Sequence, residues 1–189
     1  MNFNNFTIKS QEAVQKAVEI TSANGQQAIE PVHLLKGVVD VGESLVNYIF
    51  QKLGVNVNLL KTAVDREIAS LPKVSGGEPY LSREANAVLQ KASDYSSKMG
   101  DQFVALESIL MALLQTKSSA SSFMKDAGIN EKELGAAIDE LRKGQSVKDA
   151  SAEDTYNALS KYAINLNERA RTGKLDPVIG RDDEIRRVL

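Results

Sequence analysis

Few residues in this chain of 189 amino acids could support covalent or metal chemistry, and their spacing favours neither. There is no cysteine, which excludes disulfides and thiolate metal sites. A phosphate-binding loop needs a Gly-rich string that leads to Lys-Ser or Lys-Thr, whereas Gly76-Gly77 leads to Glu78-Pro79. His33, the single histidine, lies beside Leu34 on a predicted helix face, where a structural role such as donation to a backbone carbonyl is the simpler interpretation. We therefore predict no catalytic residue and no metal site.

Two carboxylates, Asp101 and Glu107, have more informative positions. Asp101 follows Gly100, which is expected to end one helix, and Glu107 falls in the first turn of the next. A carboxylate there can accept hydrogen bonds from the free N–H groups of a helix start, which alone would account for either residue. The alternative is a pair of acceptors at the rim of an apolar groove, able to engage a peptide backbone or a basic side chain. The sequence leaves both interpretations open.

The segments around these residues occur twice, about 75 positions apart. Gln15-Lys16-Ala17 recurs as Gln90-Lys91-Ala92, and Gly25 recurs as Gly100. After a shift of one position, Gly54-Val55-Asn56 recurs as Gly128-Ile129-Asn130. A repeat of this length indicates two stacked units with a pseudo-symmetric interface. Two similar bundles that meet form a groove, which favours a binding module over an active site.

Helical periodicity dominates both copies, and the predicted fold class is all-α, a tandem repeat of two four-helix units. The first copy covers about residues 1–72 and the second about 79–143. Asn24-Gly25 should end the first helix, Pro31 should begin the second, and Asn56 or Asn58 should cap the fourth. The expected helices of the second copy are 82–98, 105–115, 119–127 and 130–142.

Two segments interrupt this pattern. Residues 71–79, with two prolines and two glycines, should connect the copies without regular structure. Residues 144–151 have one valine among small and polar residues, which predicts a mobile linker and places the end of the double repeat near residue 143. A charged helix is expected over about 152–171, and the last residues resemble a helix cut off mid-pattern, as in a fragment of a longer protein.

Composition sets the broad class. Hydrophobic residues make up 42% and charged residues 25%, which is typical of a soluble globular protein. A formal net charge of −2 gives no reason to expect nucleic acid or an anionic membrane as a partner. No signal peptide or bilayer-spanning apolar run is recognisable, so a cytoplasmic location is the simplest expectation.

Specific strings resemble a known family. Asn5-Phe6-Thr7, the double repeat and the segment 29–35 (Ile-Glu-Pro-Val-His-Leu-Leu) resemble the Clp amino-terminal domain. The strings at 158–162, 166–170 and 173–187 resemble the beginning of the first AAA+ module of the class I Clp ATPases, and within that class the disaggregases. The resemblance covers the whole chain, with residues 152–189 as a linker helix and the truncated start of that module.

The resemblance implies a function. The family's N-domain is an all-α pseudo-dimer that binds unfolded or aggregated polypeptides, and its substrate-contact positions match Thr7, Asp101 and Glu107. An apolar groove should lie nearby between the copies, although two of its positions carry Lys91 and Ser108 here. Capture of apolar segments would be followed by hand-over to a hexameric threading ATPase.

The resemblance also implies where nucleotide would bind. Val178, Ile179 and Gly180 would lie against the adenine of ATP, with Mg²⁺, in the full-length protein. The Walker segments would lie beyond Leu189, so this chain should be monomeric and should not hydrolyse ATP, whereas the full-length protein should be a homohexamer. One alternative is an adaptor-docking N-domain of a protease-coupled Clp ATPase. Another is an enzyme with an unrecognised site in the groove, which the scarcity of His and Cys disfavours.

Overall fold

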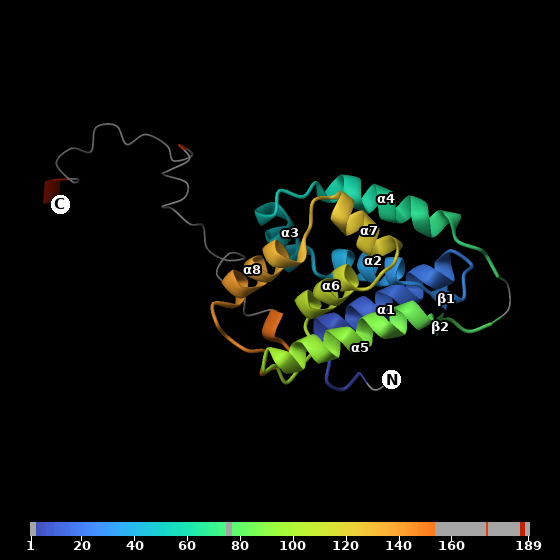
Figure 1. Ribbon diagram of the computed structural model, residues 1–189, viewed down its shortest axis with the longest axis horizontal. Helices are drawn as coiled ribbons and strands as arrows, with labels where there is room; N and C mark the ends of the chain where they lie inside the picture. Colours follow the sequence, from blue (N-terminus) through green and yellow to red (C-terminus); the bar gives the residue numbers. More distant parts are fainter. Residues whose placement is uncertain (1–2, 75–76, 154–172, 174–185, 188–189) are drawn as a thin grey trace. The chain divides into compact units, whose positions relative to one another are not determined.

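The computed structural model describes residues 3–74, 77–153, 173 and 186–187 (Figure 1). Met1–Asn157 and Ala158–Leu189 form separate units, and the description below concerns the first. The helices of the first copy are α1 (Ile8–Ala23), α2 (Pro31–Val41), α3 (Glu43–Lys52) and α4 (Val57–Ser70). Those of the second copy are α5 (Arg83–Lys98), α6 (Leu106–Gln115), α7 (Ser119–Asp126) and α8 (Glu131–Arg142). The all-α class predicted from the periodicity is confirmed.

Side-chain caps explain most of the helix starts. The side chains of Thr7, Asn56, Ser82, Ser118 and Asn130 each accept a hydrogen bond from the amide three residues on. These bonds satisfy N–H groups that have no partner inside the helix. The same turn ends α1 and α5, since Gly25 and Gly100 have φ of 67° and 74°, values that favour glycine.

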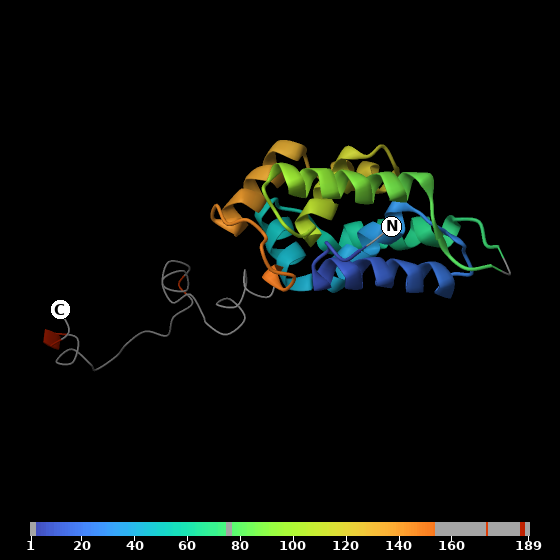
Figure 2. The same cartoon turned by 90° about the horizontal axis from the view of Figure 1, so that it is seen from below.

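The helices α2 and α6 form the centre of the molecule. Helix α2 packs against α1 and α6 packs against α5, while α2 and α6 also contact each other across the two copies. Figure 2 shows α1 and α5 on opposite sides, with α6 between them. All residues from Leu106 to Leu114 are buried, and a single hydrophobic cluster draws residues from both copies. The interface between the copies is therefore part of the core.

Two short parallel pairings hold the copies in register. Strand β1 (Ala28–Ile29), which precedes α2, pairs with β2 (Tyr80–Leu81), which precedes α5. The counterpart pairing joins Phe6, before α1, to Val104, before α6. In each case the entry to one copy's first helix pairs with the entry to the other copy's second helix. Segments of one or two residues carry no periodicity, so the sequence analysis did not predict them.

Residues 143–153 lie against the second copy. Val147 is fully buried and packs with Ala105, Ala152 and Phe103. The backbone of Val147 also bonds to Asp101 and Gln102, and that of Ala150 to Ile8. The mobile linker predicted over residues 144–151 is at odds with this packing, because the sequence interpretation assumed that one valine could not anchor the segment. The predicted helix 152–171 lies outside the described residues beyond Glu153.

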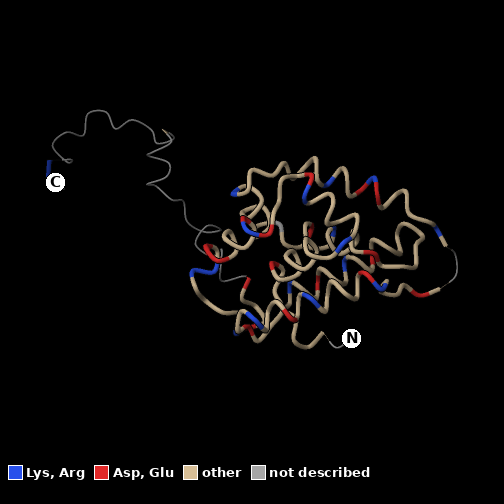
Figure 3. Tube along the Cα trace, viewed as in Figure 1, with Lys and Arg blue, Asp and Glu red and all other residues tan. Residues whose placement is uncertain are grey.

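Acidic and basic residues are interspersed over the helices (Figure 3). In the described part of the chain, no helix is long and apolar enough to cross a membrane.

Candidate functional site

The three predicted site residues meet at one place, which we call the charged junction: Thr7, Asp101, Glu107, Arg142 and Glu153. The Phe6–Val104 pairing brings the copies together there, since the Thr7 amide donates to the Val104 carbonyl at 3.0 Å. Thr7 is the N-cap of α1, and Glu107 lies in the first turn of α6. The two helix starts face each other, as a shared site requires.

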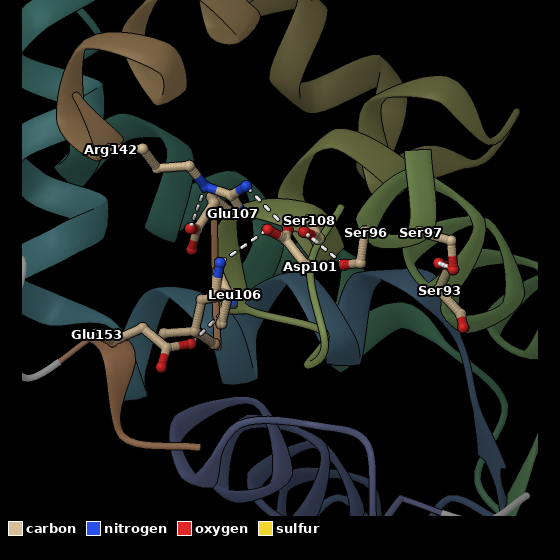
Figure 4. A network of polar contacts seen from close by, with 10 residues as sticks. Ser93, Ser96, Ser97, Asp101, Leu106, Glu107, Ser108, Arg142 and Glu153 are labelled. Carbon is tan, nitrogen blue, oxygen red and sulfur yellow. Dashed lines mark hydrogen bonds and ion pairs between the residues drawn. The ribbon is translucent and has the colours of Figure 1, made fainter. Parts of the chain in front are cut away.

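Arg142, at the end of α8, binds both carboxylates of the second copy (Figure 4). Its Nη1 lies 2.9 Å from Asp101 Oδ2, and its Nε lies 2.9 Å from Glu107 Oε1. The side chains of Asp101 and Glu107 are fully buried, and that of Arg142 is 2% exposed. Burial alone would lower the pKa of Arg142, but the adjacent Glu107 and Asp101 raise it above its ordinary value. The guanidinium therefore stays charged.

Glu153 adds a third carboxylate from a distant part of the sequence. Its Oε1 accepts from the Thr7 hydroxyl at 2.5 Å and from the Leu106 amide at 3.1 Å. The N-cap of α6 is Ala105, which has no side-chain oxygen, so Glu153 caps this helix instead. Burial raises the pKa of Glu153 to about 7, with a further contribution from nearby Glu107 against the opposing effect of the Thr7 hydrogen bond.

The junction retains unused hydrogen-bonding capacity. Glu107 Oε2, Arg142 Nη2 and Glu153 Oε2 are buried atoms without a protein hydrogen-bond partner. Asp101 and Glu107 share one guanidinium, whereas Glu153 binds the Thr7 hydroxyl and the Leu106 amide. Burying charged groups costs free energy unless they are fully paired.

Thr7, Asp101 and Glu107 have contacts that bear on the two interpretations of the sequence. Thr7 does cap its own helix, since its hydroxyl accepts from Ser10 N at 3.2 Å. Asp101 and Glu107 do not bind the helix-start amides; they bind Arg142, and Asp101 also accepts from Val147 N at 2.8 Å. Helix-start capping is therefore the wrong explanation for these two, whereas their role toward a client stays a prediction.

The sequence analysis missed Arg142 and Glu153. Arg142 could have been found by extending the repeat, because the shift of 74 positions pairs it with Ile68, a buried apolar residue of α4. A charge at a position that is apolar in the other copy is a usable signal. Glu153 lies beyond the repeat, so no internal comparison could have identified it.

The predicted groove positions do not line an open surface together. Lys91 is exposed and its Nζ donates to the Gln115 carbonyl at 3.0 Å, while Ser108 is buried and accepts from Ser96 Oγ at 2.9 Å (Figure 4). A hollow of about 540 Å³ lies elsewhere, on the outer face of α1 between Phe3 and Val41. Residues of the first copy alone line it.

His33 has the structural role that the sequence suggested, with the hydrogen bond in the opposite sense. Its Nδ1 accepts from the Glu30 amide, and its Nε2 lies 2.9 Å from Gln26 Oε1. Burial lowers the pKa of His33 to about 4, so it is neutral at physiological pH. Within the described residues there is no group of three His, Cys, Asp or Glu that could hold a metal. Val178, Ile179 and Gly180 lie outside the described residues.

Comparison with known proteins places this geometry in a family. The family model for the Clp repeat (R) N-terminal domain matches residues 5–127. The chain belongs to this family. It is 67% identical over its whole length to the chaperone protein ClpB of Bacteroides thetaiotaomicron and 62% identical to that of Porphyromonas gingivalis. The chain spans 22% of the length of each of these relatives.

Solved structures of Clp N-domains share the fold. The Hsp104 N-terminal domain from Candida albicans superposes with a TM-score of 0.72 at 22% identity, covering 79% of this chain and 99% of that one. The N-terminal domain of ClpD from Arabidopsis thaliana has a TM-score of 0.59 at 24% identity, covering 75% of this chain and 97% of that one. At this level of identity the likeness concerns the fold alone.

Proposed function

We propose that this Clp N-domain is the client-binding domain of a ClpB-type disaggregase. It captures exposed segments of unfolded or aggregated polypeptides and passes them to the hexameric ATPase of the full-length, cytoplasmic protein. In that protein Val178, Ile179 and Gly180 contact the adenine of ATP, with Mg²⁺ bound alongside. The chain of 189 residues itself has no ATPase activity.

The convergence of Thr7, Asp101 and Glu107 at one junction supports this proposal. Thr7 belongs to the first copy, and Asp101 and Glu107 belong to the second, 94 and 100 positions later in the sequence. The pairing of Phe6 with Val104 nevertheless brings them together. Their surroundings are polar, buried and incompletely hydrogen-bonded, as suits recognition of a peptide backbone. Asp101 and Glu107 are singled out by their positions in the sequence, and the resemblance to the family adds Thr7.

The proposal is tested by measuring the affinity of the chain for a permanently unfolded protein, such as a reduced and carboxymethylated one, by fluorescence anisotropy. Asp101→Asn and Glu107→Gln remove a charge and keep the side-chain shape. Each should weaken binding roughly tenfold, the effect of losing one hydrogen bond to a charged group.

Asp94→Asn is the matched control, because it removes an exposed carboxylate of α5 away from the junction. Its affinity should equal that of the unchanged chain. Thermal unfolding of all the variants separates binding from stability. Equal affinity in Asp101→Asn, Glu107→Gln and the control would exclude the junction as the client site.

A further inference from the structure

Residues 145–153 lie along the charged junction and are attached largely through their backbone. The Val147 amide donates to Asp101 Oδ1 at 2.8 Å, and the Val147 carbonyl accepts from Gln102 N at 2.8 Å. The Ala150 carbonyl accepts from Ile8 N, also at 2.8 Å. Every peptide carries these backbone groups, so the contacts do not depend on this particular sequence.

Three buried side chains of the segment, those of Val147, Ala152 and Glu153, determine which peptides fit the site. Val147 is fully buried beside Ala105 and Phe103, a space suited to a small apolar residue. Six positions later, the Glu153 carboxylate accepts from the Thr7 hydroxyl and the Leu106 amide. Lys148 and Asp149, between them, are exposed. The junction therefore selects a small apolar residue at the position of Val147 and a small residue followed by a carboxylate at those of Ala152 and Glu153, whereas the positions of Lys148 and Asp149 tolerate any side chain.

The corresponding place in the first copy is occupied by a segment that is joined to helices at both of its ends. There the connector between the copies fills it, with the Val74 amide donating to the Gly25 carbonyl and the Leu71 carbonyl accepting from Gln26. That connector joins α4 to α5, so its removal would pull on the core. Residues 145–153 follow α8, and the helices α1 to α8 precede them in the chain. They can leave without displacing any of these helices.

We propose that residues 145–153 are an internal occupant of a peptide-binding site, and that a client segment of similar chemistry, with a turn at the positions of residues 149–152, displaces them. The client segment carries a residue of the size of valine, followed six positions later by Glu, Asp or a terminal carboxylate. The inference rests on the proposed function and adds the class of peptide. It also explains why Thr7 and Glu107 are fully buried here.

The attachment of the occupant is weak enough for exchange. Its buried apolar anchors are Val147 and Ala152, both small. Two free-energy costs oppose this apolar burial: the loss of conformational entropy when the segment is ordered, and the burial of the Glu153 carboxylate next to Glu107. Because the segment is tethered to α8, it competes with a free peptide as if present at roughly millimolar concentration.

The experiment adds a labelled ten-residue peptide with the sequence of residues 144–153 to the 189-residue chain and to its Val147→Asp variant. An aspartate at 147 would be buried beside Ala105 and close to Asp101, so the attached segment should leave the site. The variant should bind the peptide at least tenfold more tightly than the unchanged chain does. The unfolded protein used above should also bind the variant more tightly.

Three controls sharpen the result. Lys148→Ala changes an exposed residue of the same segment and should leave peptide affinity as in the unchanged chain. A peptide with aspartate in place of its valine should not bind. A second releasing variant, Glu153→Lys, places a cation against two hydrogen-bond donors and should reproduce the effect of Val147→Asp. Hydrogen exchange at the Ile8 and Gln102 amides should accelerate in both releasing variants, which confirms release in a folded chain.

Failure of this inference differs from failure of the proposed function. If the amides exchange faster but neither peptide nor unfolded protein binds more tightly, residues 145–153 do not occupy a client site. The proposed function stands in that case if Asp101→Asn still weakens client binding. If no variant binds the unfolded protein at all, the proposed function is also wrong.

Discussion

The two copies build equivalent junctions with opposite chemistry. The neutral junction of the first copy consists of Gln26, Val32, His33 and Ile68 with Ser82 of the second copy. Under the repeat, Gln26 corresponds to Asp101, Val32 to Glu107 and Ile68 to Arg142. Gln26 donates to the Ile68 carbonyl at 2.6 Å, whereas Asp101 pairs with the Arg142 side chain.

The backbone framework of the two junctions is nevertheless the same. The Ser82 amide donates to the Ile29 carbonyl, and the Thr7 amide donates to the Val104 carbonyl, at 3.1 and 3.0 Å. Ser82 and Thr7 cap the first helix of their copies. Because the neutral junction forms without a charged pair, the fold does not require charges at this place. Charges at this place in the second copy are compatible with the client-binding role that we propose.

Replacing Arg142 by methionine should give the largest loss of stability. It leaves Asp101 and Glu107 buried without their cation, and breaking a buried ion pair costs about 3–5 kcal/mol. The free energy of unfolding, measured by urea denaturation at pH 7, should fall by this amount.

The first copy suggests a matched rescue. The triple variant Asp101→Gln, Glu107→Val, Arg142→Ile installs the residues of the neutral junction and removes all three charges together. It should be more stable than Arg142→Met alone, because it removes both carboxylates together with their cation, and replacing all the partners of a buried ion pair is often close to neutral. A triple variant as unstable as the single one would show that the two junctions are not equivalent.

The neutral junction should weaken in acid because of His33. Its pKa is about 4 when folded and 6.5 when exposed, so the unfolded chain binds the additional proton between these values. Stability from this group is complete above pH 6.5 and is lost as the pH falls toward 4, by up to about 3 kcal/mol. The loss is the difference in unfolding free energy between the unchanged chain and His33→Gln, measured by urea denaturation at several pH values.

Glu153 should give the charged junction the opposite response. Its pKa, about 7 when folded, is above the ordinary 4.5, so the contribution of this group is complete below pH 4.5 and lost as the pH rises toward 7. Glu153 is present in both the unchanged chain and the His33→Gln variant. The difference between their pH dependences of stability is therefore the contribution of His33. If His33→Gln loses as much stability in acid as the unchanged chain, His33 is not the group responsible.

We expect α1 and α2 of the first copy to approach each other more closely than α5 and α6 of the second, and Gly37→Ala tests this. A Cβ at Gly37 would lie 2.2 Å from the Ala13 carbonyl oxygen, so α2 must move away from α1. The second copy has Ala112 at the corresponding position of α6, fully buried. The substitution should cost about 1–3 kcal/mol, as overpacked cores do. Thermal or urea unfolding measures this.

Gly135→Ala in α8 is the control for helix propensity. A Cβ there meets only Met111 Cε, at 3.8 Å, so the change should raise stability by about 0.5–1 kcal/mol. Equal effects of the two substitutions would contradict a closer approach of helices in the first copy.

Much of the fold could be predicted from the sequence because the determinants are local. Asn56 and Asn130 cap helices where expected, and Gly25 and Gly100 end them. Each signal lies within a few residues of the boundary it sets, which is why the predicted helices agree closely with the observed ones.

The candidate site depended on contacts that local patterns do not record. Arg142 reaches Asp101 across 41 positions, and Glu153 reaches Thr7 across 146. Residues 144–151 were predicted to be mobile because their composition offers little apolar surface. The structure orders them through backbone hydrogen bonds, which composition does not reveal.

Substitutions of two helix caps separate the two junctions by function. Thr7→Ala and Ser82→Ala each remove a helix N-cap, and each should cost about 0.5–2 kcal/mol. Ser82 belongs to the neutral junction, which is covered by the connector between α4 and α5. Thr7 also donates to Glu153 in the charged junction, where we place the client.

Binding of the unfolded protein should therefore respond to one substitution and not to its counterpart. In the Val147→Asp variant, where the attached segment has left the site, Thr7→Ala should weaken client affinity several-fold, whereas Ser82→Ala should leave it unchanged. Anisotropy titrations at a temperature well below both unfolding transitions make this comparison. If both variants lose affinity in proportion to their loss of stability, Thr7 acts as a cap and the client does not contact it. If Thr7→Ala alone loses affinity, the hydroxyl that caps α1 also belongs to the binding site, and the two junctions differ in function as well as in charge.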